Sequence, residues 1–138
     1  MKHLILLLVL LSSVSFAYSQ NDTIPQNNPD TSVCAWLYVY RIKNFAGSAV
    51  GYDLHIDDSV VCRVRNNSKY AIPLRKESKI EIWSKSEQKV SFIIDVKCSK
   101  AYYIKCGIKM GILKGRPDLS LISPEQGEVE YNAVKGRN

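Results

Sequence analysis

The sequence lacks most of the side-chain groupings that enzymes and metal sites use. Only two histidines occur in its 138 residues, His3 and His55. It contains no GxGxxG, P-loop or HExxH segment, so nothing indicates a site for a dinucleotide, a nucleotide phosphate or a catalytic zinc ion. It also has no CxxC pair and no histidine close to a cysteine, and structural zinc sites need such spacings. We therefore expect a protein that is not an enzyme and that holds no metal or cofactor.

Long apolar runs are also missing, apart from one near the N-terminus. Leu4–Leu11 follows a positively charged start and precedes the small residues Ala17 and Ser19. This order is typical of a cleavable secretory signal, and the run is shorter than the roughly 20 residues that a membrane span needs. We expect residues 1–19 to be removed and the protein to be exported to the periplasm, the cell surface or the medium, with no membrane span left. An uncleaved anchor is the alternative. No cysteine lies near the junction, so lipid attachment there is not expected.

Acidic residues are outnumbered: 13 Asp and Glu stand against 19 Lys and Arg, which gives a net charge of +6, or about +5 without Lys2. The basic residues are scattered along the chain. Their default role is a solvated face that keeps sheet edges from pairing. The alternative is a patch for anionic glycans or lipid head groups. Because export makes nucleic acid an unexpected partner, we expect an envelope protein or a glycan.

Cysteine is scarce, and all four cysteines lie after the expected signal: Cys34, Cys62, Cys98 and Cys106. An exported protein meets an oxidising compartment, where disulfide bonds form. Four cysteines allow three complete pairings, and the sequence does not choose among them. Unpaired cysteines buried in the core are the alternative.

A helical period of 3.6 residues is missing from almost the whole chain. Apolar and polar residues instead alternate with a period of two, which indicates half-buried strands. Seven such segments are separated by polar turns, and they comprise residues 34–41, 52–56, 60–65, 70–74, 79–83, 90–96 and 102–109. This spacing predicts an all-β fold, an antiparallel β-sandwich or an open barrel of about seven to eight short strands.

The expected mature chain fits a single domain. Removing residues 1–19 from 138 leaves 119, an ordinary domain length. Residues 20–32 are polar and contain two prolines, so we expect a flexible leader. We place the folded domain at residues 33–134 and a frayed tail at residues 135–138. Ser123-Pro124 supplies a capping residue and a first-turn proline, which predicts a short C-terminal helix, although Gly127 weakens it.

Individual strands carry more detailed expectations. Both faces of residues 34–41 are apolar, as in a strand that is covered on both sides. In residues 60–65, Val60, Cys62 and Val64 share one face and Arg63 and Arg65 lie on the other, so we expect the first three side chains to point inward. Pro73 suits an edge strand because proline has no backbone N–H to donate.

Five short segments resemble, in their order and spacing, a known family of exported domains. They are Tyr38-Val39-Tyr40-Arg41, residues 47–58, Tyr70–Leu74, residues 99–104 with their paired tyrosines, and Gly115-Arg116-Pro117. On these segments the chain resembles the DUF2846 family of small exported bacterial domains over residues 35–131. The function of that family is unknown, so the resemblance implies only the fold and the exported setting. Many of its members look like lipoproteins, whereas this chain lacks the lipidated cysteine.

The chain departs from the family pattern at three turns. Asp58 stands in place of a turn glycine, Ser99 replaces the glycine before the paired tyrosines, and residues 75–78 lack the usual Pro-Gly turn. Asp and Ser enter positive φ less readily than Gly. We therefore expect these hairpins to be looser or differently shaped than in the family.

The candidate site is a binding surface, and no catalytic residue is predicted. Arg41, the loop from Phe45 to Val50, Tyr103 and Arg116 belong to the segments of the family pattern without being obvious core residues. We expect them to converge on one surface.

Two other functions stay open. His55 lies on the strand face opposite Leu54 and could serve an envelope hydrolase, although no nucleophile or orienting partner can be identified; a solvated or turn-packed histidine is the alternative. An accessory or inhibitor protein could instead bind a partner through an open sheet edge. Asp57 and Asp58 could in principle ligate calcium, but a tight turn explains them better.

Overall fold

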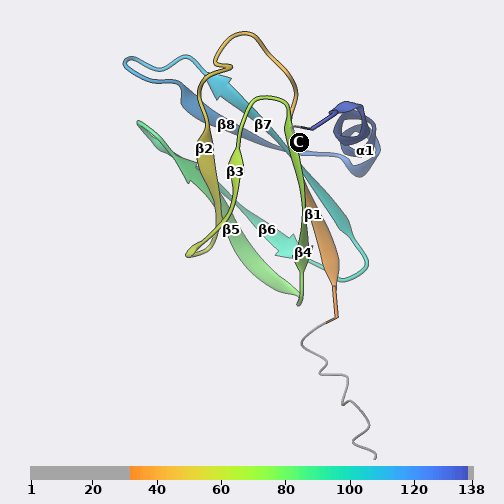
Figure 1. The fold of residues 1–138 in the computed structure, drawn as a ribbon. Coiled ribbons are helices and arrows are strands. Elements are labelled where there is room, and N and C mark those ends of the chain that lie inside the picture. The colour runs from red at the N-terminus through yellow and green to blue at the C-terminus, as the bar shows by residue number, and fades with distance from the viewer. Residues whose placement is uncertain (1–31, 137–138) are drawn as a thin grey trace, which may run out of the picture.

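The computed structural model describes residues 32–136, which form two packed β-sheets and one helix (Figure 1). In chain order the elements are β1 (Ala35–Arg41), β2 (Tyr52–Ile56), β3 (Ser59–Val64), β4 (Ser68–Leu74), β5 (Ser78–Lys85), β6 (Lys89–Val96), β7 (Ala101–Lys109), β8 (Arg116–Ile122) and α1 (Pro124–Ala133). The expected signal at residues 1–19, the expected leader up to residue 31, and residues 137–138 of the expected tail lie outside the described residues.

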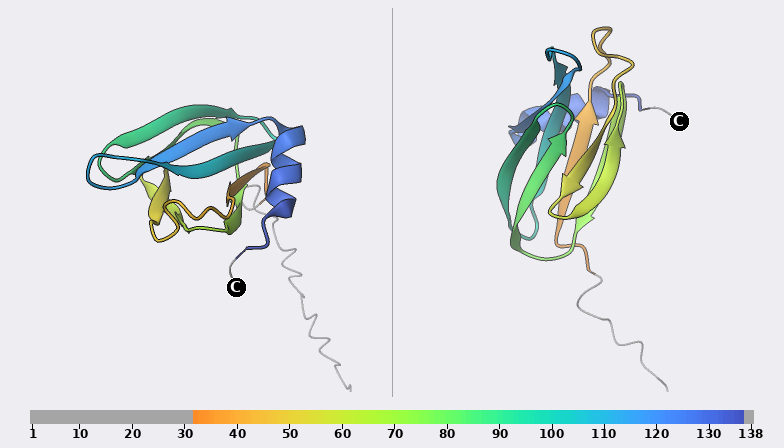
Figure 2. Two further views of the ribbon diagram at one scale, coloured as in Figure 1. Left: turned by 90° about the horizontal axis from the view of Figure 1, so that it is seen from above. Right: turned by 90° about the vertical axis from the view of Figure 1, so that its left-hand side faces the viewer.

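The two sheets have four strands each. The first has the strand order β4-β1-β7-β8 and the second the order β3-β2-β5-β6. Neither closes into a barrel, and they face each other across one core (Figure 2). The predicted all-β sandwich with a short C-terminal helix is therefore confirmed, and the open barrel is excluded. Pro73 lies on the edge strand β4, as its sequence context predicts.

One strand pair departs from the antiparallel prediction. β1 and β7 run parallel, with Trp36 opposite Ala101 at their starts. The period of two assigns side chains to faces, but it does not give the direction of a neighbouring strand that comes from a distant part of the chain. Cys34 and Cys98 precede these two strands and form a disulfide bond. The bond therefore links the starts of two strands that no turn connects.

The other two cysteines carry free thiols. Cys106 is buried in the core, and Cys62 packs against it from β3. Burial raises the pKa of the Cys106 thiol to about 12 and that of the Cys62 thiol to about 12. Because the thiolate is the reactive form, both groups are inert at neutral pH.

The main core lies between the sheets, where Leu54 and Ile82 are fully buried. On β3 the predicted alternation breaks, because the pairing register with β2 shifts between Leu54 and His55. Val60 was expected to point inward but is 60% exposed, so that prediction is wrong. Val61 packs against the core instead. A β-bulge adds one residue to a strand and so exchanges the faces of the residues beyond it.

α1 lies against the outer face of the first sheet, where it covers a second, smaller core (Figure 1). Tyr38 stacks on Tyr103 with 4.9 Å between ring centroids, and Tyr131 of the helix meets Tyr38 edge-on at 5.0 Å. Tyr40 is fully buried, and its hydroxyl donates a hydrogen bond of 2.9 Å to Glu130. β1 is thus covered on both faces, as its apolar sequence predicts.

Gly127 explains how closely the helix approaches the sheet. A Cβ at this position would lie 2.4 Å from the Cβ and Cγ atoms of Tyr103. The residue that weakens the helix by propensity is therefore the one that lets it seat on the sheet. The predicted cap is present, since the Ser123 hydroxyl accepts the backbone N–H of Gln126. Among residues 32–136 no helix is long and apolar enough to cross a membrane.

Among residues 32–136, three turns hold a non-glycine residue at positive φ, namely Asp57, Asn67 and Ser99. Ser99 has a φ of 61°, and in the first hairpin the positive φ of 49° belongs to Asp57 rather than to Asp58. The Asp57 N–H donates to the Glu81 carbonyl, and its carboxylate accepts the Glu81 N–H, both at 2.9 Å. The Ser99 N–H donates to the Cys34 carbonyl at 2.7 Å. Bonds to neighbouring strands therefore fix conformations that Asp and Ser adopt at some cost.

β8 is the strand that the alternation did not reveal. Pro117 and Asp118 stand at its start, and both residue types are depleted in strands. The strand lies at the edge of the first sheet, where a missing N–H removes no hydrogen bond between strands.

Replacing Gly127 with alanine tests the seating of the helix. We expect a loss of about 1–3 kcal/mol in the free energy of unfolding, because the added methyl group meets the Tyr103 ring. Helix propensity alone predicts the opposite sign, a gain of about 1 kcal/mol. Val129→Ala on the same helix, at a residue that is 71% exposed, is the control and should change stability by less than about 0.5 kcal/mol. Urea unfolding followed by circular dichroism measures both. A Gly127→Ala protein as stable as wild type would contradict the close contact.

Thiol counting tests the disulfide assignment. In the folded protein an aqueous thiol reagent should label no cysteine rapidly, since both free thiols have raised pKa values. Unfolding without reduction should expose two thiols, which mass spectrometry should locate at Cys62 and Cys106. Unfolding with reduction should expose all four. Four labels without a reductant would show that the Cys34–Cys98 bond is absent.

Candidate functional site

One end of the sandwich carries its longest connections, and we call it the loop end (Figure 1). Four connections meet there, at residues 42–51, 65–67, 86–88 and 110–115. The connections at the opposite end are at most four residues long. Binding residues concentrate on loops that a rigid scaffold positions, so the loop end is the first place to look for a site.

Arg41, the last residue of β1, holds the loop 42–51 from inside. Its side chain is only 2% exposed, and its guanidinium donates to the carbonyl oxygens of Val50 (2.6 Å) and Gly47 (2.7 Å). Gly47 has a φ of +70°, and a Cβ there would lie 3.1 Å from Ile108. Arg41 therefore positions the loop. That Arg41 also forms part of a binding surface stays a prediction.

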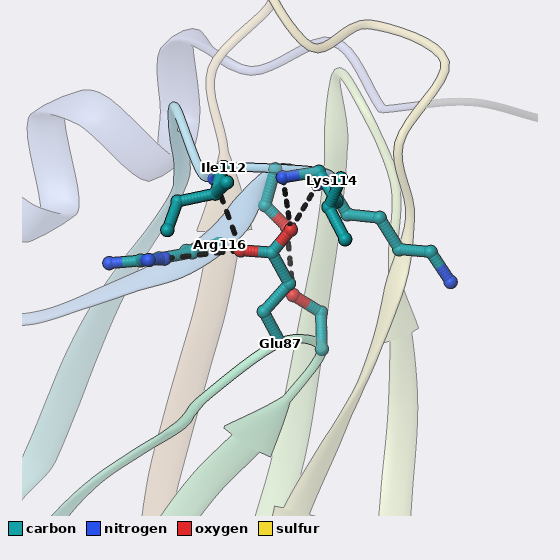
Figure 3. A network of polar contacts seen from close by, with 7 residues as sticks. Glu87, Ile112, Lys114 and Arg116 are labelled. Atoms are coloured by element: carbon teal, nitrogen blue, oxygen red, sulfur yellow. Dashed lines mark hydrogen bonds and ion pairs between the residues drawn. The ribbon is translucent and has the colours of Figure 1, made fainter.

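Glu87, in the turn between β5 and β6, holds the loop 110–115 (Figure 3). Its carboxylate accepts the backbone N–H groups of Ile112, Leu113 (2.7 Å) and Lys114, and the Nε–H of Arg116 (3.4 Å). These donors hold the pKa of the Glu87 carboxyl below its ordinary value, and the Lys114 N–H has the largest effect. Successive backbone amides thus form a concavity that binds this carboxylate as such concavities bind other anions.

The loops 42–51 and 110–115 both pack against Ile108. A Cβ on Gly111 would lie 1.8 Å from the Lys114 carbonyl oxygen and 2.6 Å from the Glu87 carboxylate, so only glycine lets the loop 110–115 turn back on itself beside that group. The Ser86 hydroxyl donates to the carbonyl of Gly115 at 2.8 Å. A Cβ on Gly115 would lie 2.6 Å from Ile108, the residue that also packs beneath the loop 42–51. The loops are therefore fixed relative to each other.

Four large apolar side chains project from these loops into solvent. Phe45 is 97% exposed, Met110 88%, Ile112 86% and Leu113 89%. Figure 2 shows both loops projecting beyond the ends of the strands at the same end of the sandwich, with the tip of the loop 110–115 set apart from the loop 42–51. Removing one such side chain from water stabilises by about 1.5–3 kcal/mol. A group of them at one end of a domain marks an interaction surface.

Positive charge surrounds these apolar residues. The cations of the loop end are the buried Arg41 and the residues Lys43, Arg65, Lys85, Lys109, Lys114 and Arg116, and the carboxylates are Glu87 and Asp118. The Lys109 ammonium pairs with Asp118 at 2.8 Å, and Arg116 pairs with Glu87. The other three lysines have no ion pair among residues 32–136. The loop end therefore has an excess of positive charge.

Three of the four predicted site residues lie at the loop end: Arg41, Phe45 and Arg116. Tyr103 does not, since it pairs with Ile122 at the other end of the hairpin in which Lys109 pairs with Arg116. Tyr103 is 7% exposed beneath the helix, so the prediction that it joins a binding surface is wrong. The alternation of β7 correctly placed one of its paired tyrosines away from the main core, but it could not show that a helix covers that face.

Sequence reasoning missed Glu87 and the apolar residues of the loop 110–115. The available signal was a group of large apolar residues outside any alternating segment: Met110 precedes Gly111, and Ile112 and Leu113 lie between Gly111 and Gly115. Glu87 gave no signal, because its partners come from a distant loop of the other sheet.

His55 has a packing role in this structure. Its ring stacks on Trp83 with 3.7 Å between centroids, and its Nδ1 atom is buried without a hydrogen-bond partner in the described chain. The Trp83 indole N–H donates to the Asp57 carbonyl at 2.7 Å, so the stack also braces the neighbouring turn. Within residues 32–136 no three side chains of His, Cys, Asp or Glu group as metal ligands would. The hydrolase hypothesis stays a prediction without a supporting contact.

A hollow of about 680 Å³ opens between β3 and β4 at the opposite end of the sandwich. Its walls include Leu74, Ile80 and Val96, which are buried residues of the main core. The hollow is thus the margin of the core where the two sheets separate.

No protein-family model, curated protein or solved structure matches the chain. Membership of the DUF2846 family therefore stays a prediction.

Replacing Glu87 with alanine tests the anchoring of the loop 110–115. The loop amides that bind the carboxylate should lose protection from hydrogen exchange, by at least about tenfold, while amides of the sheets keep theirs. Acidification should act in the same direction. A lowered pKa stabilises the folded state above the ordinary Glu value of about 4.3, and the contribution is lost as pH falls through the folded pKa. Glu81→Ala, which removes an exposed partner of Lys89, is the control. Unchanged protection in the Glu87 variant would show that other contacts order the loop.

Proposed function

We propose that this chain is an exported, non-enzymatic binding module of the bacterial envelope that engages its partner through the loop end. The observation that carries the proposal is the exposure of Phe45, Met110, Ile112 and Leu113 on two anchored loops. Apolar side chains that only filled space would pack against the sandwich. These four point away from it, so burying them requires a second surface.

The anchoring of the two loops supports a binding role. Arg41 fixes one loop through two carbonyls, and Glu87 fixes the other through three backbone amides. Loops ordered before binding lose less conformational entropy when a partner arrives. Exposed apolar side chains on ordered loops therefore support a binding role.

Export is supported by the N-terminal signal pattern, and a disulfide bond is compatible with an oxidising compartment. Binding through an added strand has less support. β4, one edge of the first sheet, contains Pro73, and β3, an edge of the second, contains the bulge near Val61. Proline and bulges are devices that block pairing at sheet edges.

Photo-crosslinking tests the proposal in the protein's own setting. A photoreactive residue at Phe45 or Ile112 should crosslink to envelope material in cells, because these positions face the partner. The same residue at Ile93, 70% exposed on the second sheet, or at Val129 on α1 is the control and should give little product. Equal crosslinking at all four positions, or none at the loop positions, would contradict a partner at the loop end.

A further inference from the structure

We infer that the surface bound by the loop end is an anionic lipid membrane, into whose interfacial layer the apolar loop residues insert. This inference rests on the proposed function and names its partner. Three features of the loop end carry it: the shape of the apolar surface, the state of the loop backbone, and the position of the charges.

The apolar surface has the shape of two projecting loops rather than a flat patch. Phe45 lies on one loop, and Met110, Ile112 and Leu113 lie on the other. A stable protein interface buries about 800 Å² of contiguous, complementary surface on each partner. Loop tips offer little such area on a single plane. A bilayer interface needs no complementary shape, because its fluid chains fill the space around any inserted side chain.

The backbone of the loop 110–115 is prepared for an apolar medium. In water, exposed amides can bind solvent, but in lipid every unpaired N–H costs several kcal/mol. The Glu87 carboxylate accepts the N–H groups of Ile112, Leu113 and Lys114 (Figure 3). The charge of that carboxylate is in turn balanced by Arg116. Three amides of the loop, those of Ile112, Leu113 and Lys114, are thus already paired within the protein.

The cations occupy the level of the head groups. Lys109 and Arg116 form the last pair of the β7–β8 ladder, so they stand directly behind the loop tip. Lys114 lies within the loop, and Lys43 lies on the neighbouring loop two residues before Phe45. Interfacial segments place apolar residues about 5–10 Å below the head groups and basic residues among the phosphates. Each basic residue near an anionic surface adds about fivefold to the partition coefficient.

Vesicle co-sedimentation of the mature, disulfide-bonded chain tests the inference. The protein should partition into vesicles of phosphatidylglycerol and phosphatidylethanolamine but much less into phosphatidylcholine vesicles, and added salt should weaken binding. The M110S/I112S/L113S triple variant should lose at least about tenfold in partition coefficient, since it removes the inserted side chains. K43Q/K114Q should lose about 25-fold, from fivefold for each lysine.

Matched controls distinguish insertion of the loop residues from nonspecific hydrophobic adsorption to vesicles. I93S and V129S remove exposed apolar side chains elsewhere and should bind vesicles like wild type. Circular dichroism should show that every variant is folded. In an F45W variant, the tryptophan fluorescence should shift to the blue with anionic vesicles only, because the ring then leaves water.

The outcomes distinguish this inference from the proposed function. If vesicles bind neither wild type nor variants while Phe45 and Ile112 crosslink to a protein, the lipid inference fails and the binding module stands. If vesicle binding is the same for wild type and the triple serine variant, insertion of the loop is excluded. If vesicle binding and crosslinking both fail, both proposals fall.

Discussion

Hydrogen bonding of irregular backbone by two charged side chains determines the shape of the loop end. Residues 42–51 and 110–115 have no neighbouring strand to satisfy their carbonyls and amides, and backbone groups without partners are costly when they leave water. Arg41 supplies donors to the first loop, and Glu87 supplies acceptors to the second. Because the polar groups turn toward these anchors, the large apolar side chains turn outward.

The same contacts tie the two sheets together. Glu87 lies between β5 and β6 of the second sheet, whereas the loop that it binds joins β7 and β8 of the first. Ser86 adds a hydrogen bond to Gly115 beside it. At the other end, the Cys34–Cys98 bond links β1 and β7 within the first sheet. Each end of the sandwich thus has a specific link between segments distant in sequence, in addition to the shared core.

The limits of sequence reasoning follow from the range of the interactions. Alternation of side chains is a local property, and it correctly predicted most strands and the sandwich. Val60 was misplaced because a bulge depends on the partner strand, and the parallel direction of β7 depends on a pairing partner many residues away. The Tyr103 side chain combines an apolar ring with a polar hydroxyl, so a tyrosine at this position suits the surface as well as the interior. The close contact of Tyr103 with Gly127 of α1 decides that this tyrosine is buried.

The candidate site illustrates the same limit more sharply. Phe45 and Arg116 were identified from segments of a family pattern, yet the residues that make the surface distinctive are Glu87 and the loop that it holds. In the sequence, an exposed glutamate and an apolar loop are two ordinary features. An apolar loop without an anchor would collapse onto the sandwich or promote aggregation. Joined to Glu87 through the amides of Ile112, Leu113 and Lys114, it is instead held away from the core. The buried Arg41 and the anchored Glu87 thus hold the loops whose large apolar side chains stay in solvent, and this arrangement is the observation on which the proposed binding role depends.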